Sequence, residues 1–147
     1  MSLRPARGAV LAFDFGEKRI GVAVGELELT IPHALTVIAA EDNDSRFAAI
    51  AALLTEWRPV RLVVGIATHA DGAIHESGRL ARRFGQRLHG RFGIAVDFVD
   101  ERLTSHAAEA ALRESGMRAD KRAALLDAAA AAEILRTWFA APPGSQT

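Results

Sequence analysis

The sequence predicts one α/β domain in which helices cover both faces of a mixed five-stranded sheet. Apolar residues first recur with the period of two that is typical of strands, and after about residue 43 helical spacing alternates with short apolar runs. Three strands followed by alternating helices and strands are typical of an α/β sandwich. The 147 residues, half of them hydrophobic, suffice for one core. We expect a single domain over residues 8–141, an N-terminal arm over 1–7 and a disordered tail over 142–147.

The first three predicted strands form an antiparallel meander. Residues 10–15 and 19–25 have strand patterns and are joined by a tight turn with the sequence GEK. A third extended segment lies within residues 28–39 and is interrupted by Pro32.

The remaining segments alternate between helix and strand. Helical spacing predicts a helix over residues 44–57, which Asp44 or Ser45 would cap and Pro59 would end. The apolar run at 61–67 predicts a strand that is buried on both faces. The later predicted elements are a helix over 77–91, a strand over 93–99, and helices over 104–115 and 121–141.

The composition limits the classes of partner. Lysine plus arginine and aspartate plus glutamate number 18 each, so the formal net charge is zero and attraction to a polyanion must come from local patches. The absence of cysteine excludes disulfides and zinc–thiolate sites. No apolar run approaches the roughly 18 residues of a membrane span, and the N-terminal run is too short for a signal peptide. We expect a cytoplasmic protein without membrane association.

The first strand carries an acid where a lone acid is costly. Asp14 shares a face with Val10 and Ala12, so its carboxylate leaves the sheet among apolar neighbours. A buried carboxylate costs several kcal/mol unless it is paired, protonated or bound to a metal. The alternative is an Asx turn, in which Asp14 accepts backbone hydrogen bonds before the next glycine.

Two further acids are candidates to meet Asp14. Glu101 follows a strand end, where doubly wound sheets hold ligands, although Asp100 competes for this role. Asp127 lies in or beside the inward stripe of the last helix, among alanines that allow the backbone to come close. The alternatives are an exposed ion pair between Glu101 and Arg102 and a solvated Asp127.

Together the three acids predict a metal site. Close carboxylates repel each other and raise each other's pKa, so such a cluster requires cations. Sites made of oxygen ligands suit Mg²⁺ or Mn²⁺, and two such ions can stabilise the attacking and leaving oxygens of a phosphodiester. We therefore predict that Asp14, Glu101 and Asp127 are metal ligands and catalytic residues of a nuclease.

Cationic side chains indicate a nucleic-acid surface. The helix over 77–91 carries five arginines, three of them in an i, i+4 row, and other cations follow two of the acids in the sequence. The alternative is a solvated helix face that carries charge for solubility. Few aromatic residues are interleaved with these cations, so we expect recognition of shape and backbone rather than base sequence. The predicted phosphate contacts are Lys18, Arg19, Arg79, Arg83, Arg87 and Arg102.

Four ordered motifs resemble those of the YqgF (RuvX) family. They read FDFGEKRIGVAV near the start, VVGIATHADG in the middle, VDERLTS after the last strand and DAAAAAEIL in the last helix. The resemblance implies an RNase H-like fold and a bacterial, cytoplasmic nuclease that processes the 5′ end of pre-16S ribosomal RNA. It also implies that the family's three acids correspond to Asp14, Glu101 and Asp127.

The middle motif departs from the family pattern. Ala67 stands where the family has a proline, whereas Asp71 and Gly72 are retained. Without the proline we expect a looser loop and altered substrate positioning rather than the loss of a ligand. His69 and His75 are candidates to hold phosphate or shuttle a proton, and the alternative is that both are solvated.

Other functions are compatible with parts of the sequence. A four-way DNA junction as substrate would favour a homodimer with two suitably spaced sites. Sugar kinases and actin-like ATPases share the Asp-x-Gly opening, but they need a second domain that 147 residues do not provide. A non-catalytic, RNA-binding ribosome assembly factor is the third alternative. The predicted partner is therefore precursor ribosomal RNA or branched DNA.

Overall fold

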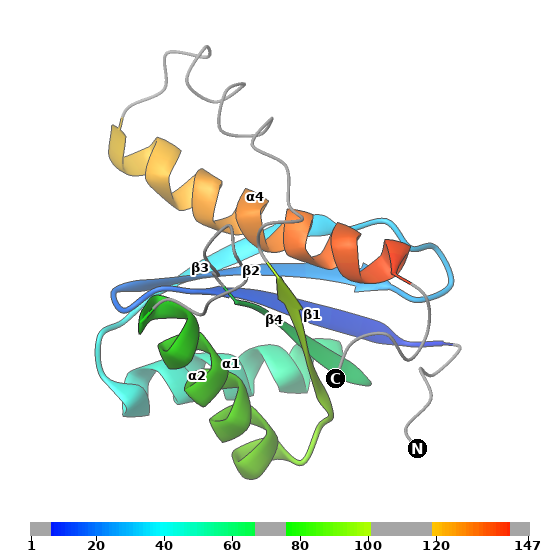
Figure 1. The fold of residues 1–147 in the computed structure, drawn as a ribbon, viewed down its shortest axis with the longest axis horizontal. Helices are drawn as coiled ribbons and strands as arrows, with labels where there is room; N and C mark the ends of the chain where they lie inside the picture. The colour runs from blue at the N-terminus through cyan, green and yellow to red at the C-terminus, as the bar shows by residue number, and fades with distance from the viewer. Residues whose placement is uncertain (1–6, 67–75, 101–118, 142–147) are drawn as a thin grey trace.

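In the computed structural model, which describes residues 7–66, 76–100 and 119–141, a five-stranded sheet lies between two helical layers. Helices α1 and α2 cover one face of the sheet and α4 covers the other (Figure 1). The predicted helix over 104–115 lies outside the described residues. Within the described ranges, no helix is long and apolar enough to cross a bilayer. The elements are β1 (Ala9–Phe15), β2 (Arg19–Glu26), β3 (His33–Ala39), α1 (Asn43–Trp57), β4 (Arg61–Ile66), α2 (Glu76–Phe92), β5 (Val96–Asp100) and α4 (Ala119–Ala140).

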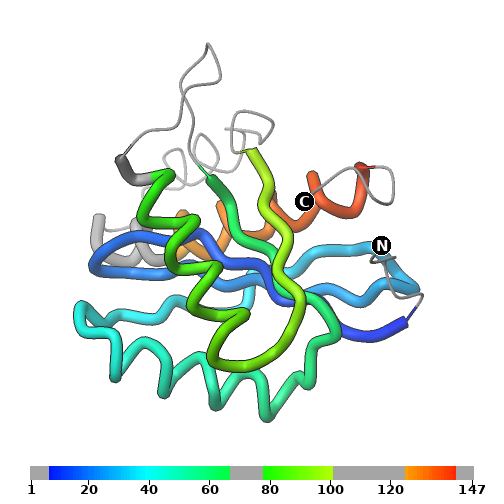
Figure 2. Tube along the Cα trace, turned by 60° about the horizontal axis from the view of Figure 1, so that its bottom comes forward, coloured from blue at the N-terminus to red at the C-terminus, as the bar shows by residue number. Residues whose placement is uncertain are grey.

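The strand order is β3-β2-β1-β4-β5. β2 is antiparallel to both β1 and β3, whereas β4 is parallel to β1 and β5 is parallel to β4. This topology confirms the predicted sandwich with three antiparallel N-terminal strands. Because β1, β4 and β5 run in the same direction, their carboxyl ends meet at one edge of the sheet, and Figure 2 shows β4 and β5 reaching that edge side by side.

The two faces of β1 pack against different helical layers. Leu11 is buried, and Phe15 is half-buried, in a cluster with residues of α1 and α2. Val10 and Ala12 are fully buried in a second cluster with residues of α4. Side chains of a strand alternate between faces, so Asp14 belongs to the α4 face.

Helix α4 approaches the sheet so closely that no side chain fits beneath it at Gly21. A Cβ atom built on Gly21 would overlap the carbonyl oxygen of Asp127. Gly21 lies directly opposite Asp14 in the pairing of β1 with β2. The next inward residues of the helix, Ala128 and Ala131, are buried and small. The alanines of α4 therefore serve close packing, as the sequence predicted.

The C-terminal part of α4 is fixed by a hydrogen bond to β5. Trp138 Nε1 donates to Asp97 Oδ2 at 2.8 Å, and Arg61 Nη1 lies 3.1 Å from both carboxylate oxygens of Asp97. Arg61 and Asp97 are only 6% and 7% exposed. The network joins β4, β5 and α4 and satisfies a buried carboxylate.

Most boundaries of the described elements lie within one or two residues of those predicted, and two differences have a clear local cause. Asp42 caps α1 instead of Asp44 or Ser45, because its carboxylate accepts a hydrogen bond at 2.9 Å from the Ser45 N–H, a donor that the first helical turn leaves unsatisfied. Strand β5 begins at Val96 rather than at residue 93. Gly93 has a φ of 71° and ends α2 in the left-handed conformation, which a strand residue does not adopt.

Replacing Gly21 should push α4 off the sheet. We expect Gly21→Ala to lower the free energy of unfolding by about 3 kcal/mol, since overpacking against backbone atoms cannot be relieved by a side-chain rotation. Gly90→Ala is the matched control, because a Cβ atom at Gly90 meets nothing within 4 Å and alanine favours a helix interior by about 0.5–1 kcal/mol. Urea unfolding followed by circular dichroism measures both values, and equal effects of the two changes would contradict the close packing.

Removing the charge of Asp97 should destabilise the fold. We expect Asp97→Asn to cost about 3 kcal/mol, because it takes away the charge opposite the buried guanidinium of Arg61. The control is Arg136→Gln, which breaks the pair of Arg136 with Glu133 where Arg136 is 58% exposed, and should cost about 0.5 kcal/mol or less. The same unfolding assay separates these outcomes. A loss below about 1 kcal/mol for Asp97→Asn would show that the buried pair is not a major source of stability.

Candidate functional site

The structure brings two of the predicted acids to the same place on the α4 face. Asp14 pairs with Gly21, and directly opposed residues of antiparallel strands have Cα atoms about 4.5–5.5 Å apart. The backbone of Asp127 contacts Gly21 from above. Asp14 is half-buried, and the side chain of Asp127 is 27% exposed. Both acids thus lie at the border between the core and solvent.

The carboxylate of Asp127 has one close cationic neighbour. Arg19 Nε lies 2.8 Å from Asp127 Oδ2, which makes an ion pair, although the N–H is not aligned for a hydrogen bond. Within the described part of the chain, this buried oxygen accepts no hydrogen bond. A desolvated anionic oxygen with spare accepting capacity is costly unless a cation compensates it. Arg19, predicted to contact phosphate, instead pairs with an acid, and its side chain is 46% exposed.

Strand β5 reaches the same edge of the sheet as Asp14. Val64 pairs with Phe13 on one side and with Phe98 on the other. One residue further along these parallel strands, Asp14 is level with Val99 across β4.

The direction of side chains on β5 distinguishes the acids at its end. Asp97 bonds to Trp138 of α4, and Val99 packs in the α4 cluster. Phe98 packs against the other layer. Alternation therefore directs Asp100, the last residue of β5, to the α1 and α2 face, away from the face of Asp14.

Several predicted site residues lie outside the described residues. They are Glu101, Arg102, His69, His75 and the loop residue Ala67. Among the residues that are described, no group of three acidic, histidine or cysteine side chains is placed to hold a metal ion. The described part of the site is thus the Asp14 and Asp127 pair with Arg19.

The arginines of α2 differ in their contacts. The guanidinium of Arg82 lies 4.9 Å from the centroid of the Phe98 ring, and that of Arg91 lies 4.3 Å from the centroid of Phe47. These two arginines stack on rings of the protein, as cation–π pairs do. The alternative of a structural role therefore applies to these two arginines.

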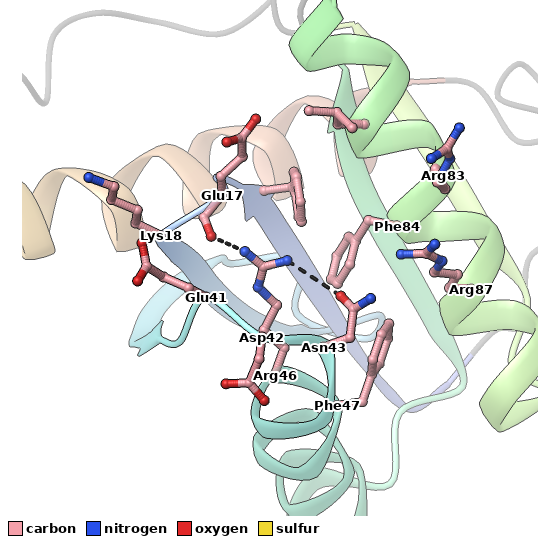
Figure 3. A pocket seen from close by; sticks show the side chains of 12 residues that line it. Glu17, Lys18, Glu41, Asp42, Asn43, Arg46, Phe47, Arg83, Phe84 and Arg87 are labelled. Carbon is pink, nitrogen blue, oxygen red and sulfur yellow. Dashed lines mark hydrogen bonds between the residues drawn. The ribbon is translucent and has the colours of Figure 1, made fainter.

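Two members of the predicted arginine row line a hollow on the α1 and α2 face. Arg83 and Arg87 border a cavity of about 540 Å³ that also contacts α1 and the turn between β1 and β2 (Figure 3). Lys18, in that turn, is a further lining residue. Arg79, the third member of the row, is exposed and does not line the hollow.

A buried arginine that sequence reasoning missed holds this turn in place. Arg46 is 8% exposed, and its guanidinium donates to the carbonyl oxygens of Ala40 and Glu17 and, at 3.5 Å, to Asn43 Oδ1. The bond to Glu17 reaches the residue before Lys18. Its sequence signal was a charged residue directly before the buried stripe of α1, which by itself is too common to be informative.

The fold is similar to that of a solved structure of RuvC. T. thermophilus RuvC in complex with a Holliday junction substrate matches with a TM-score of 0.56 and 19% identity, over 92% of this chain and 99% of that one. At this identity the likeness shows the fold, which is RNase H-like.

Curated relatives are much closer in sequence. A protein of Dechloromonas aromatica is 60% identical over 135 residues, 92% of each chain, and one of Methylobacillus flagellatus is 52% identical over 134 residues, 91% of this chain and 92% of that one. Both carry the name "Putative pre-16S rRNA nuclease". The family model RuvX, described as Holliday junction resolvase, matches residues 8–141. This chain belongs to the RuvX family.

Proposed function

We propose that this protein is an endonuclease that uses divalent cations to hydrolyse phosphodiester bonds in precursor ribosomal RNA, at the 5′ end of the 16S portion. The observation that carries the proposal is the meeting of Asp14 and Asp127 at Gly21. Close relatives that carry the name of a pre-16S rRNA nuclease support the choice of substrate. The proposal places the protein in the cytoplasm with RNA as its partner.

Glu101 is the third acid of the proposed site. It directly follows β5, whose carboxyl end lies at the edge where Asp14 is found. Asp97 and Val99 face α4, and Glu101 follows Val99 at the same period of two in the sequence. Asp100 belongs to the opposite face, which favours Glu101 in the choice that the sequence left open.

The donor set fits a hard divalent cation. Asp14, Glu101 and Asp127 would hold Mg²⁺ or Mn²⁺, since carboxylate oxygens are the preferred ligands of both ions. The buried Oδ2 of Asp127 is ion-paired with Arg19 but accepts no aligned hydrogen bond from the described residues, and this incomplete set of partners supports the assignment. When bound, the cations would stabilise the negative charge that develops on the phosphodiester oxygens during hydrolysis.

The neighbouring cations of this chain orient the substrate in this proposal. Arg19 holds the Asp127 carboxylate, and its half-exposed side chain can pair with a phosphate oxygen instead. Lys18 is exposed in the same turn, and Arg102 directly follows Glu101 in the sequence. These three residues, with the arginines of α2, would position the backbone of the nucleic acid.

A four-way DNA junction is the second candidate substrate. The description of the matching family as Holliday junction resolvase favours it, as does the likeness of fold to RuvC. The same acids would act on either substrate, but junction cleavage would also require a homodimer. The substrate must therefore be decided by a direct comparison.

Loss of either described acid should abolish cleavage. We expect Asp14→Asn and Asp127→Asn each to lower the cleavage rate by more than about 100-fold. Loss of a residue that only supports a metal ligand typically costs up to about 100-fold, so a larger loss indicates a direct ligand. Asp44→Asn is the matched control, because Asp44 is exposed in the first turn of α1 and should leave the rate unchanged. Purified variants are incubated with a pre-16S 5′-leader RNA, and in parallel with a four-way DNA junction, in Mg²⁺, in Mn²⁺ and in EDTA.

The outcomes distinguish the candidates. Cleavage by Asp14→Asn at the rate of the unmodified protein would refute the assignment of the acids. Faster cleavage of the junction would favour DNA as the substrate, and tight RNA binding without cleavage in either metal would favour an assembly factor. Calorimetric titration with Mn²⁺ gives a readout that is independent of cleavage, and both acid variants should bind the ion more weakly.

The affinity for nucleic acid should fall as the salt concentration rises, and a phosphate contact of Lys18 should contribute to this fall. Each phosphate contact contributes about one unit to the slope of log K against log salt, so Lys18→Gln should reduce that slope by about one. Arg136→Gln removes one charge from the outer surface of α4 and should leave the slope unchanged. Fluorescence anisotropy with a labelled RNA over a series of salt concentrations measures both slopes. An affinity that does not vary with salt would contradict phosphate binding.

A further inference from the structure

We propose that the hollow between α1, α2 and the β1–β2 turn binds an unpaired nucleotide of a single-stranded RNA whose neighbouring segment lies at the acidic site. This inference rests on the proposed function, and it adds a second binding site on the opposite face of the sheet. The hollow, of about 540 Å³, contains cationic, amide and aromatic groups.

The two sites are connected by adjacent residues of one strand and one turn. Asp14 faces α4, and the next residue, Phe15, lines the hollow on the other face. Their Cα atoms are about 3.8 Å apart, as for any consecutive residues. In the following turn, Arg19 contacts Asp127 on the α4 face while Lys18 lines the hollow. A strand that crosses this turn would therefore meet cations on both faces.

The side of the hollow nearest α2 is cationic. Figure 3 shows the guanidinium of Arg87 facing the hollow from α2, across from the guanidinium of Arg46 on α1. Arg83 lies one turn earlier on α2. Arg46 is buried and fixed by acceptors of the protein, whereas Arg83 and Arg87 are exposed and can bind phosphate oxygens directly.

Three acids also line the hollow, and they are Glu17, Glu41 and Asp42. Figure 3 shows the carboxylates of Glu41 and Asp42 directed away from α2. The Ser45 N–H that donates to Asp42 lowers the pKa of this acid, so it stays charged while it caps α1. Neither of these two carboxylates is therefore directed at Arg83 or Arg87 across the hollow.

The floor of the hollow offers a small apolar surface for a base or a sugar. Phe15 is half-buried there, with the Arg46 guanidinium 5.4 Å from its ring centroid, whereas Phe47 and Phe84 line the floor from the core and are only 4% exposed. Asn43 adds a side-chain amide that can bond to a base edge. The pairing edge of a base is free to bond to this amide only when the base is unpaired, which favours a single strand over a duplex.

Matched arginine pairs on the same helix test this site. The double variant Arg83→Gln/Arg87→Gln removes the two arginines of the hollow, and Arg82→Gln/Arg91→Gln removes the two that stack on protein rings. Both lose the same charge. Binding of a short, fluorescein-labelled single-stranded RNA is measured by anisotropy in EDTA, so that metal binding and cleavage play no part, and thermal melts establish that each variant is folded.

We expect the hollow variant to bind at least about tenfold more weakly than the unmodified protein, and the control variant to change by about threefold or less. Addition of RNA to the unmodified protein should also shift the NMR signals of the Asn43 side-chain amide and the Phe15 backbone amide. Equal losses in both variants, unchanged NMR signals, or competition by duplex RNA as strong as by single strands would each overturn the proposal.

The same data separate this inference from the proposed function. Selective weakening in EDTA together with no cleavage in any metal would support the hollow and contradict the nuclease. Cleavage that is abolished by Asp14→Asn, combined with equal binding losses in the two arginine variants, would support the nuclease and overturn the hollow.

Discussion

The contact between the backbone of α4 and Gly21 determines the geometry of the acidic site. Because no side chain separates the helix from β2, the Asp127 backbone lies directly above the residue that pairs with Asp14. Trp138, about 16 Å further along the helix, is fixed to Asp97 by a buried hydrogen bond. Two such anchors on one rigid helix prevent it from rotating or sliding. The position of the Asp127 carboxylate is therefore a property of the core and not of a loop.

The carboxylates of Asp14 and Asp127 lie at positions where a negative charge adds little to the stability of the fold. Asp14 and Asp127 are partly desolvated on the α4 face, and the described residue that offsets Asp127 is Arg19, which itself is half-exposed. Asp97 differs, since a buried arginine and an indole N–H saturate it. The contrast separates a structural acid from Asp127, whose Oδ2 accepts no hydrogen bond from the described residues. Stability comes from the two apolar clusters and the Asp97 network, and it allows the costly pair to persist at the edge of the sheet.

Local patterns were sufficient for the sheet and for the faces of its residues. Alternation in β1 put Asp14 on one face, and helical spacing put Asp127 at the border of the inward stripe, as the structure has it. The remaining features depend on partners distant in sequence. The role of Arg46 becomes clear only from its hydrogen bond to Glu17. The role of Asp97 likewise becomes clear only from its contacts with Arg61 and Trp138. The start of β5 was placed too early because the left-handed φ of Gly93 is not visible in an apolar pattern.

The β1–β2 turn is held from both faces of the sheet, and the two attachments differ in strength. Arg46 is buried and bonds to the Glu17 carbonyl, whereas the contact of Arg19 with Asp127 is partly exposed and not aligned as a hydrogen bond. A cation can therefore replace Arg19 at Asp127, or a phosphate can replace Asp127 as the partner of Arg19, without releasing the turn, because Arg46 keeps the backbone in place. The exchange of partners at Asp127 then requires only the Arg19 side chain to move. The cations that border the hollow keep their positions. Substrate could bind on one face while the other face is already in its final geometry, which lowers the conformational cost of binding.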